Sequence, residues 1–180
     1  MTQGAMFNND LKLSNKFKQA FDQFYASDYF KEKYLLPLYK KDIGLKVKEI
    51  LRSDDLRFQC GIQCDAVLIL NNGNRLLFDD KVRRFKYNSY KNWFIETVSV
   101  SSKGAKNKDG WAYKEGVNIC FAQLNESENA FLGTPFCFKV DKKFIDEITR
   151  NNEFMVSTVK NEGYYTVGKL VPRNTLEKYW

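Results

Sequence analysis

The stretch that decides the fold is GIQCDAVLILNNGNRLLFDDKVRR, residues 61–84. Its short apolar run, residues 66–70, is typical of a buried strand. The next four residues, Asn-Asn-Gly-Asn at 71–74, tolerate the positive φ angles of a hairpin turn. Residues 75–84 then resume a strand pattern. The stretch therefore predicts a β-hairpin.

This hairpin brings acidic and basic side chains together. Alternate residues of a strand share a face, so Asp79 and Lys81 are predicted to be neighbours. Counting outward from the turn puts Asp65 eight residues before Gly73 and Lys81 eight residues after it. Asp65 is therefore expected beside Asp79 and Lys81 across the ladder, if a twist or bulge is allowed for.

Two carboxylates beside a lysine could hold a divalent cation. Two converging carboxylates repel each other unless a cation lies between them, and Mg²⁺ (or Mn²⁺) prefers oxygen ligands. A divalent cation lowers the pKa of bound water and stabilises charge on a phosphodiester. Lys81 could position that water or neutralise developing negative charge.

The composition excludes several other chemistries. The chain has no histidine, which rules out a Ser-His-Asp triad, a Cys-His pair and a histidine phosphoryl carrier. The 29 Lys and Arg residues exceed the 22 Asp and Glu residues by seven, which favours a polyanionic partner. Acid and base catalysis would then fall to carboxylates, lysine, tyrosine or a metal-bound water.

These residues carry a resemblance to a known family. An Asp at the base of a hairpin, followed by an acidic-x-Lys triplet in the second strand, resembles the PD-(D/E)XK nuclease superfamily. The resemblance implies that Asp65 and Asp79 bind metal and that Lys81 assists the attacking water. The proline that gives the motif its first letter is replaced by Cys64. The resemblance also implies a restriction-endonuclease-like core of α+β or α/β class, in which helices flank a mixed central sheet.

A looser likeness covers the chain downstream of the lysine. A basic segment, an aromatic strand with an acid (residues 93–97, Trp-Phe-Ile-Glu-Thr) and a polar loop ending in Gly110-Trp111 look like nuclease-like proteins of phages and mobile elements. That likeness implies Glu96 as a further metal or water ligand. The implied substrate is DNA.

Basic residues interleaved with aromatic ones are the best candidates for holding the nucleic acid, because cations contact phosphates while rings stack on bases. The interleaved basic candidates are Arg83, Arg84, Lys86 and Lys91, and the aromatic ones are Phe85, Tyr87, Tyr90 and Trp93. Lys103 and Lys106, in the polar loop, are expected to add phosphate contacts. The alternative is a solvated strand end whose rings face the core.

The rest of the chain predicts one domain over residues 1–180. It would comprise an N-terminal helical segment (1–44), a catalytic core (45–140) and a C-terminal helix with strands (141–180). The helical period predicts a helix over 11–35, and Pro37 is expected to end it or a short successor. Further predictions are strands at 92–101, 117–121, 135–140 and 164–171, a polar loop at 101–110, and a helix at 141–150 capped by Asp141.

Cellular context is indicated by what the sequence lacks. No run approaches the ~18 apolar residues of a membrane span, and the polar start has no signal-peptide character. These features predict a cytoplasmic protein without membrane contact. The cysteines at 60, 64, 120 and 137 are expected to be small buried hydrophobic residues rather than zinc ligands.

Three alternatives remain open at this point. Asp79 and Lys81 could be surface charges on an edge strand. The chain could keep a nuclease fold without catalysis and bind nucleic acid or a protein partner, as a phage-encoded inhibitor would. It could also be an interaction protein with incidental basic charge.

Cutting both strands of a duplex commonly calls for two active sites, and thus a homodimer.

Overall fold

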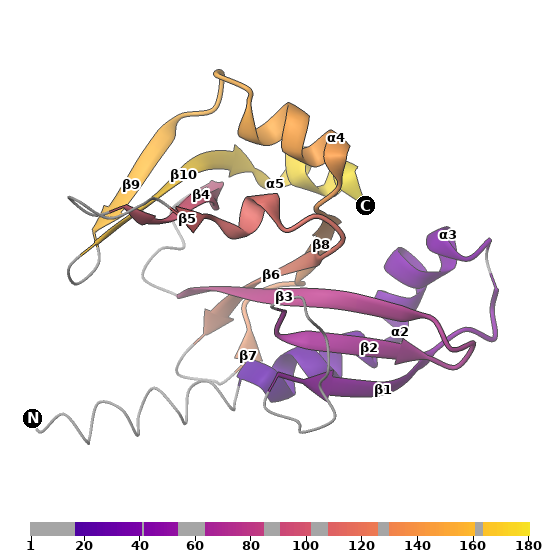
Figure 1. Ribbon diagram of the computed structural model, residues 1–180. Helices are drawn as coiled ribbons and strands as arrows, with labels where there is room; N and C mark the ends of the chain where they lie inside the picture. The colour runs from indigo at the N-terminus through magenta and orange to yellow at the C-terminus, as the bar shows by residue number, and fades with distance from the viewer. Residues whose placement is uncertain are drawn as a thin grey trace, which may run out of the picture. The chain divides into compact units, whose positions relative to one another are not determined.

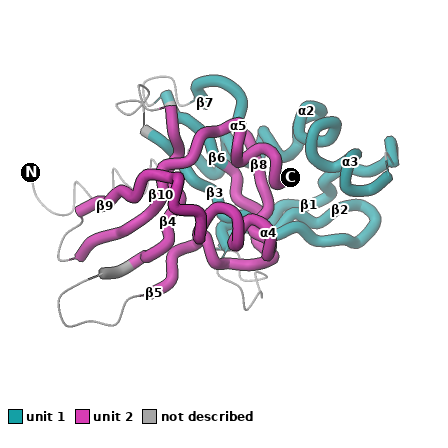
Figure 2. Tube along the Cα trace, turned by 90° about the horizontal axis from the view of Figure 1, so that it is seen from above, with its two compact units in different colours: residues 1–86, 121–135 teal, residues 87–120, 136–180 magenta. Residues whose placement is uncertain are grey.

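The computed structural model describes residues 17–40, 42–53, 64–84, 91–101, 108–125, 130–160 and 164–180. They form two β-sheets with short helical segments, so the predicted α+β class is confirmed (Figure 1). The chain divides into two compact units, residues 1–86 with 121–135 and residues 87–120 with 136–180 (Figure 2). Because each unit combines two separate stretches of chain, no single linker in the sequence could mark the boundary.

The first sheet has the strand order β1-β2-β3-β6-β7, and β8 also pairs with β6. These strands are β1 (Val47–Arg52), β2 (Ala66–Leu70), β3 (Arg75–Arg84), β6 (Asn118–Asn125), β7 (Ala130–Phe131) and β8 (Phe136–Lys139). The strands predicted at 66–70 and 75–84 are confirmed, and the one predicted at 117–121 extends to Asn125. The sequence did not indicate β1 or β7, whose side chains lack a clear period of two.

The N-terminal helical segment is interrupted, which corrects the prediction of one helix over 11–35. Residues 17–25 are helical, and a turn follows at residues 26–27. Ser27 then caps a new start, because its hydroxyl accepts a hydrogen bond from the Phe30 backbone N–H at 3.1 Å. The successor runs through α2 (Asp28–Phe30), the π-helical turn η1 (Lys31–Leu35) and α3 (Leu36–Leu38). It ends one residue beyond Pro37, as expected of a short successor helix, while residues 11–16 lie outside the described residues.

Aromatic rings join this helical segment to the first sheet. Tyr25 lies with its ring centroid 4.9 Å from that of Phe78 on β3 and 5.1 Å from that of Phe30. All three side chains are at most 1% exposed. Burying rings of this size stabilises the fold more than any other side-chain class. The segment therefore covers the face of the sheet to which Phe78 points (Figure 1).

The hairpin has a three-residue loop, which corrects the register counted from the sequence. Leu70 N–H donates to the Asn74 carbonyl at 2.9 Å, and Gly73 adopts a φ of 87° between them. A glycine in this conformation after a tight turn is typical of three-residue hairpin loops. Ala66 therefore pairs with Phe78, and the Asp65 N–H donates to the Phe78 carbonyl at 2.8 Å, so Asp65 does not lie opposite Lys81.

The second unit holds the sheet β5-β4-β10-β9. Its strands are β4 (Asn92–Ser101), β5 (Lys108–Asp109), β9 (Val156–Lys160) and β10 (Tyr165–Pro172). The strands predicted at 92–101, 135–140 and 164–171 are confirmed as β4, β8 and β10. Helical turns accompany them: η3 (Trp111–Tyr113), α4 (Lys142–Phe144), η4 (Ile145–Thr149), α5 (Arg173–Leu176) and η5 (Glu177–Tyr179).

Local signals explain part of this unit. The Asp141 carboxylate accepts a hydrogen bond from the Phe144 N–H at 2.8 Å, which confirms the predicted helix cap. The predicted loop at 101–110 is wrong at its end, because Lys108–Asp109 form β5 and pair with Val98 and Val100 of β4. Two residues are too few to show a strand period. None of the helices in the described part of the chain has the length and apolar character of a membrane-crossing helix.

Replacing Gly73 isolates the contribution of the turn. No atom lies within 4 Å of a Cβ built at this position, so the backbone conformation alone decides the effect. Gly73→Ala should lower the free energy of unfolding by about 1–2 kcal/mol, because an L-residue is strained at this φ. Gly73→Asn should cost less, since asparagine tolerates this region. Urea denaturation measures both, and an Ala variant as stable as the wild-type protein would contradict the assignment.

Candidate metal site on the β2–β3 hairpin

The alternation of β3 separates its acidic side chains between two faces. Phe78 and Asp80 point toward the helical segment, where both contact Tyr25. Asp79 and Lys81 therefore share the opposite face. Since β3 lies between β2 and β6, it is not an edge strand. The Asp79 side chain is only 5% exposed, so it is not a surface charge.

The structure brings Asp65, Asp79 and Lys81 together. The Lys81 Nζ lies 3.0 Å from Asp79 Oδ2. The carboxyl groups of Asp65 and Asp79 are within hydrogen-bonding reach of each other. The backbone N–H of Asp80 donates to Asp65 Oδ2 at 2.9 Å. We call these three side chains the hairpin cluster.

Burial and like charge govern the protonation of the cluster. Burial, the hydrogen bond to Asp79 and the negative charge of Asp79 raise the pKa of Asp65 from its ordinary 3.8 to about 7. The positive charge of Lys81 and the Asp80 N–H act in the opposite direction but are weaker. At neutral pH Asp65 is therefore about half protonated, and below that pH a proton between the two carboxyl groups relieves their repulsion. A divalent cation would displace that proton.

The donors of the cluster fit a hard divalent cation. The described residues contain no group of three or more His, Cys, Asp or Glu side chains that could hold a metal. Mg²⁺, however, retains several waters and is commonly bound by one or two carboxylates together with substrate phosphates. Asp65 and Asp79 supply those two carboxylates, and Lys81, whose side chain is 28% exposed, reaches toward solvent.

Glu96 lies in the second unit, on β4. Its Oε1 accepts a short hydrogen bond of 2.5 Å from the Ser99 hydroxyl. Gly110 packs against it so closely that a Cβ at Gly110 would lie 2.2 Å from the Glu96 carbonyl oxygen. This contact explains the glycine before Trp111, and the role of Glu96 as a ligand stays a prediction.

The basic candidates are only partly described. Arg83 lies on β3 and is half-buried, and burial lowers the pKa of its guanidinium. By alternation it shares the face of Asp79 and Lys81. Lys91 is exposed. The side chain of Arg84 and the residues Lys86, Lys103 and Lys106 lie outside the described residues, as do Phe85, Tyr87 and Tyr90.

Two predictions about other residues have clear outcomes. For Trp93 the alternative of a ring facing the core is confirmed, because the residue is 7% exposed and its ring centroid lies 5.1 Å from that of Phe136. The tryptophan is thus a core residue, because its strand position faces the interior of the second unit. Cys64, Cys120 and Cys137 are buried free thiols, as expected, while Cys60 lies outside the described residues.

Comparison with protein-family models finds no match. Comparisons with curated proteins and with solved structures find no significant match either. The case for a function therefore rests on the geometry of this chain.

Sequence reasoning missed one set of residues beside the site. Asp80 accepts a hydrogen bond from Tyr25 and forms an ion pair with Arg52 on the helix-covered face of β3. A signal was present, since alternation places Asp80 beside Phe78 in the core, where a buried carboxylate needs a cation or hydrogen-bond donors. The sequence alone could not identify Arg52 as that cation.

The raised pKa of Asp65 predicts a pH dependence of stability in the absence of divalent cations. Its folded-state pKa of about 7 exceeds the ordinary 3.8, so the native state binds more protons than the unfolded state between these values. This group's contribution to stability therefore falls as pH rises from about 4 to about 7. An Asn at 65 still accepts from Asp80 N–H and donates to Asp79. Asp65→Asn should thus stabilise the protein near neutral or higher pH, by roughly 2 kcal/mol.

Urea denaturation of both proteins in EDTA, at pH 5 and at pH 8, measures this difference. The exposed Asp109 provides a matched control, since Asp109→Asn makes the same chemical change on an exposed strand. A wild-type protein that is more stable than the Asp65→Asn variant at pH 8 would contradict the repulsion within the hairpin cluster.

Proposed function

We propose that this protein is a metal-dependent endonuclease that hydrolyses phosphodiester bonds in DNA. The observation that carries the proposal is the convergence of Asp65, Asp79 and Lys81 on one face of the β2–β3 hairpin. Two carboxylates beside one lysine meet the needs of hydrolysis without histidine, which the chain lacks.

Each member of the hairpin cluster has a distinct task in this proposal. Asp65 and Asp79 hold Mg²⁺ or Mn²⁺. The ion supplies Lewis acidity, which lowers the pKa of water and offsets negative charge on the phosphate. Lys81 orients the attacking water or neutralises charge on the phosphodiester as it is cut. The 3.0 Å contact of Lys81 with Asp79 keeps the amine beside the carboxylates until substrate binds.

Charge on the same face supports a nucleic-acid substrate. Arg83 follows Lys81 on β3, and the chain carries a formal charge of +7. Burial lowers the pKa of Arg83, yet an arginine stays charged at neutral pH. Such cations contact phosphates without reading sequence. Lys86, Lys91, Lys103 and Lys106 complete the proposed DNA-contacting set, together with Arg84.

The arrangement of the first unit supports a restriction-endonuclease-like core. A helical segment packs on one face of the sheet, and the hairpin carries its acids and lysine on the other. The acidic-x-Lys triplet is Asp79 to Lys81, as in the PD-(D/E)XK pattern, and Cys64 stands in place of the proline.

A second candidate function is a catalytically inactive nuclease-fold protein that binds nucleic acid or a protein partner. The favouring observation is that the described residues offer two clustered carboxylates and no third ligand. Such a protein would bind DNA without cutting it.

Plasmid cleavage tests the two candidates against each other. The wild-type protein should cut in Mg²⁺ or Mn²⁺ and not in EDTA. Asp79→Asn, which preserves the shape of the buried side chain, should lower the rate at least about 100-fold, and so should Lys81→Met. The exposed Lys46 supplies the matched control, since Lys46→Met removes one charge from the same unit. Wild-type protein that binds DNA in a salt-dependent manner but never cuts it would favour the binding protein.

A further inference from the structure

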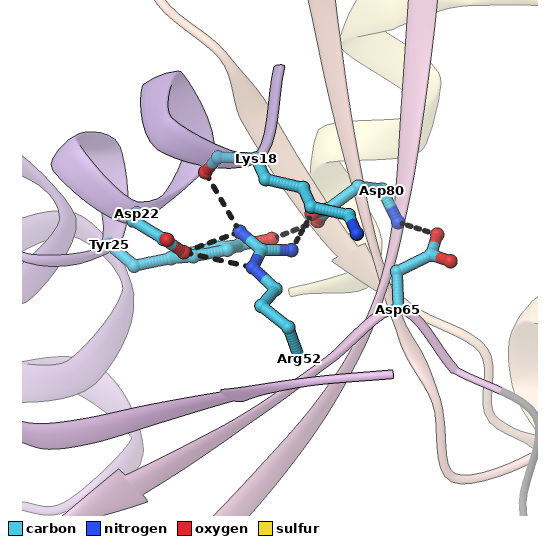
Figure 3. A network of polar contacts seen from close by, with 6 residues as sticks. All are labelled: Lys18, Asp22, Tyr25, Arg52, Asp65 and Asp80. Atoms are coloured by element: carbon cyan, nitrogen blue, oxygen red, sulfur yellow. Dashed lines mark hydrogen bonds and ion pairs between the residues drawn. The ribbon is translucent and has the colours of Figure 1, made fainter. Parts of the chain in front are cut away.

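The face of β3 opposite the hairpin cluster carries a buried network of charges. Arg52, the last residue of β1, donates from Nη1 to Asp80 Oδ2 at 2.5 Å. Its Nε donates to Asp22 Oδ1 at 2.9 Å, and its Nη2 donates to the Lys18 carbonyl at 3.2 Å. Figure 3 shows the guanidinium lying between the helix that bears Lys18 and Asp22 and the strand that bears Asp80.

Both oxygens of Asp80 are fixed by this network. The Tyr25 hydroxyl donates to Asp80 Oδ1 at 2.5 Å, while Arg52 holds Oδ2. The side chains of Arg52 and Asp80 are only 11% and 9% exposed. Charge-assisted hydrogen bonds in such surroundings are stronger than neutral ones, and the planar guanidinium restricts the directions of approach. The Asp80 side chain therefore has one orientation.

The backbone of Asp80 also contacts a residue of the hairpin cluster. Its N–H donates to Asp65 Oδ2 at 2.9 Å, and its neighbours in sequence are Asp79 and Lys81. In Figure 3 the Asp80 side chain points toward Arg52 while its backbone nitrogen points toward Asp65. An anchored side chain limits rotation of the peptide that bears this N–H. The orientation of the Asp65 carboxylate thus depends on contacts made on the far side of the strand.

We propose that Arg52 is a positioning residue for the hairpin cluster: by holding Asp80, it aims the Asp80 N–H at Asp65 and fixes that carboxylate beside Asp79. The use of the positioned carboxylate to hold a divalent cation rests on the proposed function. Partners that orient metal ligands commonly change metal affinity by about 10–100-fold when they are removed. The helix at residues 17–25 contributes to this positioning, since its Asp22 binds Arg52 and its Tyr25 binds Asp80.

A purely structural network makes a different prediction. Removing a member would then lower the unfolding temperature but leave the Asp65 contact unchanged in molecules that remain folded. Two measurements on the folded protein separate these roles. The first is hydrogen exchange of the Asp80 amide, which needs no metal. The second is Mn²⁺ affinity by calorimetry.

Three variants vary the network in steps. Tyr25→Phe removes one hydrogen bond to Asp80 and keeps the ring that packs on Phe78. Arg52→Lys keeps the charge but cannot bond Asp80 and Asp22 with the same planar group. Arg52→Gln removes the charge. If Arg52→Gln fails to fold, the milder Tyr25→Phe variant still tests the proposal. The control Arg150→Gln breaks an exposed ion pair with Asp146 in the second unit.

We expect the protection of the Asp80 amide to fall about fivefold in Tyr25→Phe, the effect of losing one hydrogen bond. It should fall further in Arg52→Gln, with Arg52→Lys between them. The Leu70 amide, which donates to Asn74 at the turn of the same hairpin and lies outside the network, serves as the reference amide. Mn²⁺ affinity should fall about tenfold in Arg52→Gln, partly recover in Arg52→Lys, and stay unchanged in Arg150→Gln.

The outcomes separate this inference from the proposed function. Folded variants whose Asp80 amide stays as protected as the Leu70 amide, with wild-type Mn²⁺ affinity, overturn the inference and leave the nuclease proposal standing. Selective loss of Asp80 protection supports the positioning role of Arg52 even if the wild-type protein binds no Mn²⁺ and cuts no DNA. A wild-type protein that neither binds Mn²⁺ nor cuts DNA would overturn the proposed function instead.

Discussion

One hairpin holds the carboxyl groups of Asp65 and Asp79 against each other, and the chemistry proposed for this site follows from that contact. Asp65 and Asp79 approach within hydrogen-bonding reach in a largely buried setting, so ionising both is unfavourable unless a cation joins them. Lys81 offsets part of this repulsion. A fold that maintains such an arrangement is poised to exchange a shared proton for a divalent ion, and this exchange links the stability of the hairpin to its chemistry.

The two faces of β3 have different roles, since one packs in the core and the other carries the hairpin cluster. One face carries Phe78 into the aromatic core against the helical segment, which fixes the strand in place. The other face presents Asp79 and Lys81. Asp80 connects the two, because its side chain is bound by Arg52 while its N–H holds Asp65. A buried ion pair of this kind is weak evidence for stability, since desolvation offsets the attraction. Its value here lies in orienting the neighbouring carboxylate.

Local periodicity made much of this predictable. The apolar run of β2, the Asn-Gly turn and the period of two in β3 indicated the hairpin and placed Asp79 beside Lys81. The register was not accessible, because the positive φ of Gly73 accompanies a three-residue loop, which shifts the pairing of β2 with β3. Arg52 lies 28 residues from Asp80, and only the packing of strands and helix makes them partners. For Trp93 the alternative of a ring in the core is confirmed, and the sequence left both open because an aromatic residue near basic ones suits a core equally well.

Anomalous diffraction from a crystal of the full chain grown in MnCl₂ shows whether a divalent ion binds at the hairpin cluster. We expect a manganese peak at bonding distance from one oxygen each of Asp65 and Asp79, with the two carboxyl groups no longer hydrogen-bonded to each other. Density showing the two carboxyl groups still within hydrogen-bonding distance of each other, with no anomalous peak beside them at neutral pH, would contradict it.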